Sequence, residues 1–124
     1  MPDDLQLTPH FKLSEFRCQH CGEVNELAAR RLASRLDLAR QFAGPMTIIS
    51  GFRCQHANAV AGGKRDSQHL VGLAADILVT NDGHRFQLVK ALIDAGLKRI
   101  GIGSSIVHAD IGDVPGFVIW TYYA

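Results

Sequence analysis

The sequence predicts an α+β fold, with a small antiparallel sheet and helices packed on one face. Two stretches carry apolar residues at three-to-four spacing, which is typical of amphipathic helices. Several shorter stretches are rich in β-branched residues and are separated by glycine, serine and proline, which is typical of strands joined by turns. The 124 residues are enough for one domain and too few for two ordinary ones, so we expect a single domain over residues 1–124.

The composition indicates a soluble globular domain. Hydrophobic residues make up 47% of the chain and charged residues 20%, which excludes disordered, collagen-like and membrane-spanning classes. The net charge is +1 and no dense basic run occurs, so nucleic acid is not expected as a partner. The acidic first residues lack the features of a secretory signal. We therefore expect a monomer that is cytoplasmic as synthesised and does not insert into a membrane.

The first half of the chain predicts an arm, a helix, a strand and a loop. Residues 1–23 form an irregular N-terminal arm by pattern, because proline and glycine interrupt any periodicity, with Leu13 and Phe16 placed to reach the core. A helix is expected over residues 25–42, with Asn25 as its N-cap and a Gly-Pro pair directly after it. A short strand follows at 46–49. The polar, glycine-rich residues 50–68 are expected to be a long loop of the kind that carries function.

The second half predicts four strands and a second helix. A strand is expected over residues 73–79, and Asn81 caps the helix that follows. That helix ends near Gly96. Its apolar residues predict the buried face, namely Phe86, Val89, Ile93 and Leu97. Three short strands complete the chain, at 100–103, 105–111 and 117–122, and antiparallel pairing through short turns is the simplest connection.

Three polar residues in apolar surroundings are candidates for a metal site. Asp76 lies in an otherwise apolar strand, where a carboxylate is costly unless it is paired or bound to a cation. His69 precedes it by seven residues, with a glycine between them, and His108 lies within another apolar strand. Two imidazoles and one carboxylate are ligands that Zn²⁺ accepts, and three protein ligands leave a fourth position open. Each residue alone also fits an ordinary structural role, as a turn cap, a local pair or a core histidine.

A local motif gives a resemblance to a known family. Residues 67–76 match the pattern Ser-x-His-x-x-Gly-x-Ala-x-Asp at all five fixed positions. Upstream, residues 50–53 read Ser-Gly-Phe-Arg, and downstream, residues 107–110 read Val-His-Ala-Asp. These segments resemble the zinc D-alanyl-D-alanine carboxypeptidase family, whose relatives include vancomycin-resistance D-Ala-D-Ala dipeptidases, phage L-alanyl-D-glutamate endolysins and the hedgehog signalling domain.

The resemblance implies roles for individual residues. His69, Asp76 and His108 would bind one catalytic Zn²⁺ in a surface groove. Arg53 would contact the substrate and stabilise its polarised carbonyl or the tetrahedral oxyanion, and Ser67 would help to seat the peptide. An ion pair on the surface is the ordinary alternative for Arg53.

The position of the general base departs from the family pattern. Relatives usually place Asp or Glu three residues before the last histidine ligand, and here that position is Ser105. Asp110 lies two residues after His108, so on a strand its side chain shares the face of that ligand. Asp110 is therefore the candidate base. A carboxylate that orients His108, or a turn residue, is an equally supported interpretation.

The cysteines and the C-terminal aromatic residues leave further alternatives open. Cys18-x-x-Cys21, together with Cys54 and His56, fits a second, closed zinc site, although ordinary reduced cysteines are the more frequent case. The aromatic residues of the last strand fit either a substrate groove or the core; they are Trp120, Tyr122 and Tyr123.

The resemblance implies a zinc metallopeptidase that hydrolyses an amide bond in the peptide stem of bacterial peptidoglycan, of the D-Ala-D-Ala or L-Ala-D-Glu type. Such an enzyme fits a phage or prophage lysis or tail protein, which reaches the wall after release or delivery or as part of the virion. The alternative is a non-catalytic, zinc-stabilised binding or structural domain on the same scaffold, and Ser105 is the residue that favours it.

Overall fold

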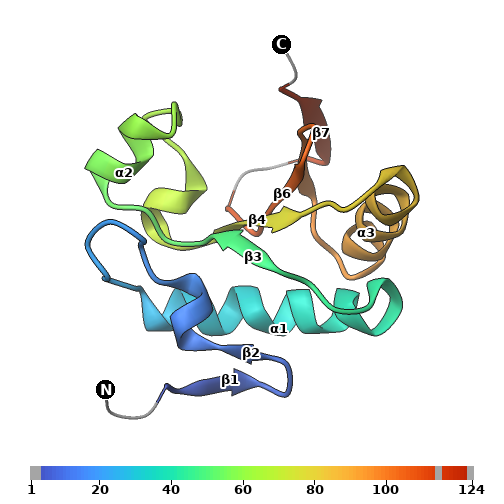
Figure 1. Ribbon diagram of the computed structural model, residues 1–124, viewed down its shortest axis with the longest axis horizontal. Helices are drawn as coiled ribbons and strands as arrows, with labels where there is room; N and C mark the ends of the chain where they lie inside the picture. The colour runs from blue at the N-terminus through green and yellow to red at the C-terminus, as the bar shows by residue number, and fades with distance from the viewer. Residues whose placement is uncertain (1–3, 114–115, 123–124) are drawn as a thin grey trace.

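A five-stranded mixed sheet forms the centre of the chain (Figure 1), whose computed structural model describes residues 4–113 and 116–122. The sheet contains β3 (Ile48–Ser50), β4 (Ala74–Leu78), β5 (Arg99–Ile102), β6 (Ile106–Asp110) and β7 (Val118–Thr121). The α-helices are α1 (Glu26–Ala43), α2 (Gln55–Val60) and α3 (Asp82–Asp94). Two 3-10 helices, η1 (Leu13–Phe16) and η2 (Gln68–Val71), and a two-stranded sheet of β1 (Gln6–Thr8) and β2 (Phe11–Lys12) complete the fold. The predicted α+β class is confirmed.

The strand order is β3-β4-β6-β5-β7, and every neighbouring pair except the last is antiparallel. The expectation of a wholly antiparallel sheet is wrong for β7, which runs parallel to β5. The reason is geometric. Both edges of β6 are already paired, one with β4 and the other with β5, so the chain leaving β6 cannot turn back beside it. It crosses over and adds β7 at the free edge of β5.

One face of the sheet carries the hydrophobic core. Strand residues alternate between the two faces, so Ala75 and Ile77 of β4 and Val107 of β6 point to the same side, where all three are fully buried. Helix α1 supplies the opposing surface, and α3 packs against α1. Leu32 and Leu36 of α1 are fully buried in this cluster. The opposite face of the sheet is therefore left for polar side chains.

The ends of α1 follow the sequence. The side chain of Asn25 accepts a hydrogen bond from the backbone N–H of Ala28 at 3.1 Å, and Gly44, with φ of 81°, ends the helix. No helix in the described part of the chain combines the length and the apolar run that crossing a membrane requires.

Two segments that were expected to be irregular contain short elements. The N-terminal arm includes β1, β2 and η1, and its predicted anchors Leu13 and Phe16 are buried. The segment over residues 50–68 includes α2, a helix of six residues. Buried Asn58 donates a hydrogen bond to the carbonyl of Lys64 at 2.8 Å and so closes the loop that follows α2. Elements this short depend on tertiary contacts rather than on periodicity, which is why the pattern missed them.

The predicted buried face of α3 is partly wrong. Phe86 is 70% exposed and Ile93 is 47% exposed, whereas Leu88, Ala91 and Leu92 are buried. A small residue at position 91 allows α3 to approach α1 closely, and this contact selects the stripe that turns inward. Phe86 and Ile93, seven residues apart, lie on a different stripe of the helix and remain outside.

Candidate metal centre

Sheet register brings Asp76 and His108 together on the polar face. Asp76 of β4 pairs with His108 of β6, and the same row continues through Gly101 of β5 to Trp120 of β7. On the other side, Asp76 pairs with Ser50 of β3. Directly paired residues point to the same face of a sheet, so Ser50, Asp76, His108 and Trp120 share the face opposite the core. The two ligand candidates are neighbours although 32 residues separate them in the sequence.

A glycine bend delivers His69 to the same place. His69 lies on η2, and Gly72 ends that turn in the left-handed conformation, with φ of 79°. The chain then enters β4 and reaches Asp76. The rings of His69 and His108 meet edge to face, with 5.0 Å between their centroids. The tight bend expected between His69 and Asp76 is therefore present.

The hydrogen bond of His69 to the backbone fixes which nitrogen faces the site. Nδ1 of His69 lies 2.7 Å from the carbonyl oxygen of Gly51, and a carbonyl oxygen only accepts, so Nδ1 carries the proton. Nε2 of the neutral ring then presents its lone pair to Oδ1 of Asp76, at 3.2 Å. Gly51 itself has no room for a side chain, because a Cβ there would lie 2.7 Å from the Cα of Phe16.

His108 also donates from one ring nitrogen and faces Asp76 with the other, but here Nε2 is the donor and Nδ1 faces Asp76. Nε2 of His108 lies 2.7 Å from Oδ2 of Asp110, so the carboxylate accepts its proton. Nδ1 of the neutral ring faces Oδ1 of Asp76 at 3.2 Å, the same oxygen that faces His69. Two imidazole lone pairs and a carboxylate oxygen therefore point at one another, an arrangement that is stable only with a cation or protons among them.

The donor set fits zinc. The three ligand atoms of His69, Asp76 and His108 lie within 4.8 Å of one another, and all three residues are buried. Two nitrogen donors and one oxygen donor match the preference of Zn²⁺, and three ligands leave a position open for a reactant. Burial opposes ionisation of the Asp76 carboxyl, but in the absence of a metal the His108 and His69 rings, when protonated, donate to it and hold its pKa well below the usual range.

Asp110 supports His108 from the side away from the other ligand candidates. Its Oδ2 contacts His108, while its Oδ1 accepts hydrogen bonds from Nε of Arg99 at 2.8 Å and from the backbone N–H of Gly112 at 3.0 Å. Burial opposes ionisation of this carboxyl, but the bonds from His108 and Gly112 lower its pKa. Asp110 lies on the face of His108, as the spacing of two predicts, and both of its oxygens are engaged.

Arg53 forms a partly buried ion pair with the other oxygen of Asp76. Its Nη2 donates to Oδ2 of Asp76 at 2.7 Å, and its Nε donates to Oγ of Ser50 at 3.0 Å. The Arg53 side chain is 16% exposed, so this is not the surface pair that was the alternative. The guanidinium lies at the edge of the candidate metal centre.

Ser67 and Ser105 occupy different surroundings. Oγ of Ser67 accepts a hydrogen bond from the backbone N–H of His69 at 3.2 Å and so caps η2. Ser105 lies in the bend before β6 and is exposed. The structure therefore gathers His69, Asp76 and His108 together with Arg53 and Asp110, and places Ser67 one turn from the site.

Sequence reasoning missed Arg99 and left the role of Trp120 open. The Arg99 guanidinium holds Asp110 and lies 5.5 Å from the Trp120 ring centroid, and that ring lies 5.2 Å from His108. Gly101 makes room for the ring, since a Cβ there would lie 2.7 Å from it. Burial and the nearby Asp76 raise the pKa of Tyr122, which directly follows β7. Tyr123, which was also considered for the groove, lies outside the described residues.

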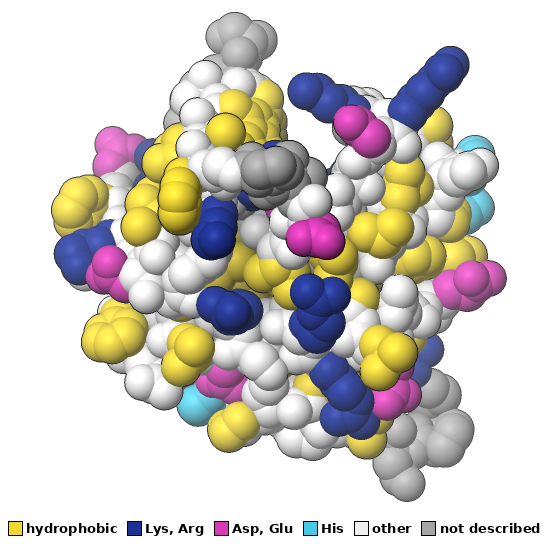
Figure 2. Space-filling model, turned by 180° about the vertical axis from the view of Figure 1, so that it is seen from behind, with side chains coloured by type: hydrophobic (Ala, Val, Ile, Leu, Met, Phe, Trp, Pro, Cys, Tyr) yellow, Lys and Arg dark blue, Asp and Glu magenta, His cyan; other side chains and the backbone are white. Residues whose placement is uncertain are grey.

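A groove of about 610 Å³ has Asp110 and Arg99 in its wall but none of the three ligand candidates, so it reaches the centre only through the contact of Asp110 with His108. Its basic lining residues are Arg31, Arg35, Lys98 and Arg99. Figure 2 shows lysine and arginine side chains gathered around the middle of this face. This patch could not be predicted from the sequence, because its residues come from α1, from β5 and from the turn before β5.

Comparisons with known proteins agree with the geometry. A family model described as Peptidase M15 matches residues 9–110, a range that contains all the residues of the candidate centre. No curated protein matches the chain. Because the family model covers well over half of the sequence, the chain belongs to the peptidase M15 family.

Proposed function

We propose that this peptidase uses zinc and hydrolyses an amide bond in the peptide stem of bacterial peptidoglycan. The observation that carries the proposal is the convergence of three donor atoms, from His69, Asp76 and His108, in a chain of the peptidase M15 family. A bound Zn²⁺ would supply Lewis-acid polarisation of the scissile carbonyl and a water of lowered pKa. The chain's own residues hold the ion and shape its surroundings.

Arg53 is the proposed residue for stabilising negative charge on the substrate. Its Nε and Nη2 are used by Ser50 and Asp76, and a guanidinium has five N–H donors, so others remain for a ligand. Because it is held in place before substrate arrives, its positive charge favours an oxyanion that develops only in the transition state. Ser67, at the start of η2, is proposed to seat the peptide.

Asp110 is proposed to position His108 rather than to accept the proton of the attacking water. Its carboxylate binds the ring nitrogen that points away from Asp76, and Arg99 and Gly112 occupy its other oxygen. A carboxylate in this place fixes the tautomer and the orientation of the ligand. The sequence allowed both roles, and this geometry favours the second.

The basic groove supports an acidic peptide as substrate. Four cationic side chains line it, and Asp110 links its wall to His108. Guanidinium groups bind carboxylates in bidentate pairs, and peptide stems with D-Glu or a free C-terminus carry such carboxylates. D-Ala-D-Ala and L-Ala-D-Glu bonds both satisfy this requirement. Action on the wall after release or delivery, in a phage or prophage lysis or tail protein, belongs to the same proposal.

A second candidate function is a zinc-stabilised domain that binds wall peptides without cutting them. The observation in its favour is that, among residues 4–113 and 116–122, the buried carboxylates are Asp76, a ligand candidate, and Asp110, which is fully engaged. Ser105 stands where relatives place an acid, and it is exposed. A free carboxylate for proton transfer is therefore not supplied by the buried residues of the described chain.

Mass spectrometry of digested peptidoglycan separates the two functions. The zinc-loaded protein is incubated with purified peptidoglycan beside a chelator-treated sample and a His69→Ala variant. New peptide termini that require zinc and His69 support the peptidase, and their identity gives the bond. Zinc-loaded protein that binds peptidoglycan and releases no fragments refutes the peptidase and supports the binding domain.

A further inference from the structure

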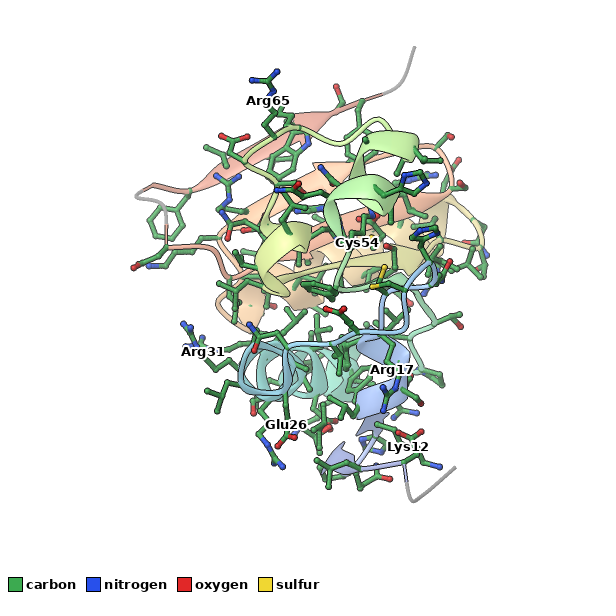
Figure 3. All side chains as sticks on the ribbon, turned by 90° about the vertical axis from the view of Figure 1, so that its left-hand side faces the viewer. Lys12, Arg17, Glu26, Arg31, Cys54 and Arg65 are labelled. Atoms are coloured by element: carbon green, nitrogen blue, oxygen red, sulfur yellow. The ribbon has the colours of Figure 1, made fainter. Side chains whose placement is uncertain are left out.

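A cluster of three cysteines lies outside the candidate metal centre. The sulfur atoms of Cys18, Cys21 and Cys54 lie within 4.8 Å of one another, and all three cysteines are free. Cys18 and Cys21 belong to the N-terminal arm, whereas Cys54 begins α2, 36 residues after Cys18. Figure 3 shows Cys54 at the start of α2, with the arm passing beside it. The fold therefore assembles three soft donor atoms from two distant segments.

We propose that Cys18, Cys21 and Cys54 hold a second, structural zinc ion, with a fourth ligand from the neighbouring pair His20 and His56. Three thiolates and one imidazole form a closed tetrahedral set, the arrangement typical of zinc sites that stabilise structure rather than catalyse. This proposal is independent of the peptidase chemistry, because no residue is shared between the two sites.

The backbone of the arm is shaped to present two thiols to one ion. The segment reads Cys-Gln-His-Cys-Gly, and two residues between cysteines is the spacing that structural zinc sites use. The N–H of Gly22 donates to the carbonyl of Cys18 at 2.8 Å, and Gly22 adopts the left-handed conformation with φ of 77°. The N–H of Cys18 donates to the carbonyl of Glu23, also at 2.8 Å. These bonds close a tight turn that holds Cys18 and Cys21 on one side.

Backbone donors point at the sulfur atoms. The N–H of Cys54 lies 3.4 Å from Sγ of Cys18, and the N–H of Ala57 lies 3.4 Å from Sγ of Cys54. Such donors favour the thiolate, which is the form that binds metal. Burial opposes ionisation of Cys18, but backbone hydrogen bonds from Cys54, Cys21 and His20 lower the pKa of its thiol to about 6.

Charge repulsion within the cluster opposes ionisation of all three thiols together. A backbone hydrogen bond from Glu23 lowers the pKa of Cys21, but desolvation and the neighbouring Cys18 and Cys54 sulfurs outweigh it and raise the pKa overall. Three thiolates at this separation repel one another, so full ionisation requires a positive charge among them. A divalent ion meets that requirement, since it binds thiolates and displaces their protons.

The fourth ligand comes from two imidazoles on the same two segments. His20 lies between Cys18 and Cys21, and His56 lies two residues after Cys54. Their rings stack with centroids 4.4 Å apart and planes inclined by 32°. Neither ring belongs to the group of donor atoms within 4.8 Å of one another, so one of them has to turn toward the sulfur atoms, and because both residues are exposed the core does not hinder that rotation.

The second ion would tie the N-terminal arm to the segment that carries Arg53. Cys54 follows Arg53 directly, and the backbone N–H of Phe52 donates to the carbonyl of Phe16 at 2.9 Å. A metal crosslink at Cys54 therefore fixes the chain next to the guanidinium that contacts Asp76. Removing it breaks this crosslink without removing any proposed ligand of the first ion.

Native mass spectrometry of reduced protein, refolded with excess zinc and desalted, counts the ions. We expect two zinc ions in the unaltered chain, one in Cys21→Ser, one in His69→Ala and none in the double variant. Cys21 is exposed, so serine there leaves the core intact, whereas Cys18 is buried and its variants risk misfolding. One ion in the unaltered chain, retained in Cys21→Ser, overturns the proposal. A mass two hydrogens lower without a second ion, which indicates a disulfide, also overturns it.

The histidine pair is tested by the rate of zinc loss to a chromophoric chelator. The double variant His20→Ala, His56→Ala is expected to lose the second ion at least tenfold faster than the unaltered chain. His84→Ala is the matched control, because His84 lies at the start of α3, outside both proposed metal sites. Equal rates in the double variant and in this control refute the assignment of the fourth ligand.

Discussion

His108 uses its two ring nitrogens for different purposes, and the neighbours of each nitrogen decide which. Nε2 donates to Asp110, and Nδ1 faces Asp76, so the protonation of one nitrogen prepares the other to bind a cation. The same division occurs in His69, where a backbone carbonyl takes the place of the carboxylate. The ability of these two histidines to bind a cation therefore depends on the hydrogen bonds that fix their tautomers, and not only on their being histidines.

Asp110→Asn tests whether the carboxylate positions the ligand or takes a proton. In the positioning role, the variant loses the charge that orients His108, and zinc affinity falls about 10- to 100-fold. Competition against a chromophoric chelator measures this affinity. As the control, Asp113→Asn alters the other acidic residue of the groove wall and leaves zinc affinity unchanged. Unaltered zinc affinity with abolished hydrolysis in Asp110→Asn would show that Asp110 is the base instead.

Acidification is expected to release zinc from the candidate metal centre. Burial lowers the pKa of His108, but the adjacent Asp110 and Asp76 raise it above its ordinary value overall. Protons bind the same nitrogen as the metal, so zinc is held at neutral pH and is lost as the pH falls below about 6. Zinc content measured after dialysis at a series of pH values gives the curve. If both the unaltered protein and Asp110→Asn retained all of their zinc at pH 4, histidine ligation would be contradicted.

Strand β5 contributes to the centre through a residue without a side chain. Gly101 pairs with His108 and Trp120, and the indole ring lies where a Cβ would stand. Trp120 in turn lies against His108 and Arg99. Gly101 therefore lets Trp120 of the edge strand pack against His108 and helps to orient that metal-ligand candidate.

Gly101→Ala is expected to destabilise the protein by about 1–3 kcal/mol, because the added methyl group displaces the Trp120 ring. Urea unfolding monitored by fluorescence of the single tryptophan reports both stability and ring environment. Ile119→Ala is the control on β7, where the side chain is 54% exposed, and it changes stability by about 0.5 kcal/mol or less. Equal stability of Gly101→Ala and unaltered protein would show that the ring moves at no cost.

Helix α3 provides a direct test of which stripe is buried. Leu88 is fully buried, so Leu88→Ala is expected to cost about 2–5 kcal/mol of unfolding free energy. Phe86 is 70% exposed, so Phe86→Ala is expected to change it by about 0.5 kcal/mol or less. Chemical denaturation of the two variants in parallel measures both values. A larger loss in Phe86→Ala than in Leu88→Ala would restore the face that the apolar pattern predicted.

At the scale of the whole molecule, local signals were readable from the sequence and distant pairings were not. The spacing of His69, Gly72 and Asp76 lies within one turn and one strand, so the motif could be interpreted without knowing the fold. The position of Asp110 relative to His108 also follows from strand alternation alone. The helix ends at Asn25 and Gly44 were predictable because caps are local.

Other features depend on which strands and segments meet. The parallel pairing of β7, the contact of Arg99 with Asp110 and the stacking of Trp120 on His108 all require the strand order. The meeting of Cys18 with Cys54 requires the arm to fold back on α2. Periodicity and propensity describe single segments. Contacts between distant segments depend on the fold and could not be predicted from these patterns.

The central claim is that His69, Asp76 and His108 bind one zinc ion through particular atoms. A crystal structure of the zinc-loaded protein, with anomalous data collected at the zinc absorption edge, tests it most directly. We expect an anomalous peak about 2.0–2.2 Å from Nε2 of His69, Nδ1 of His108 and Oδ1 of Asp76. A fully zinc-loaded crystal without a peak among these three atoms, or with His108 ligating through Nε2, would contradict the account.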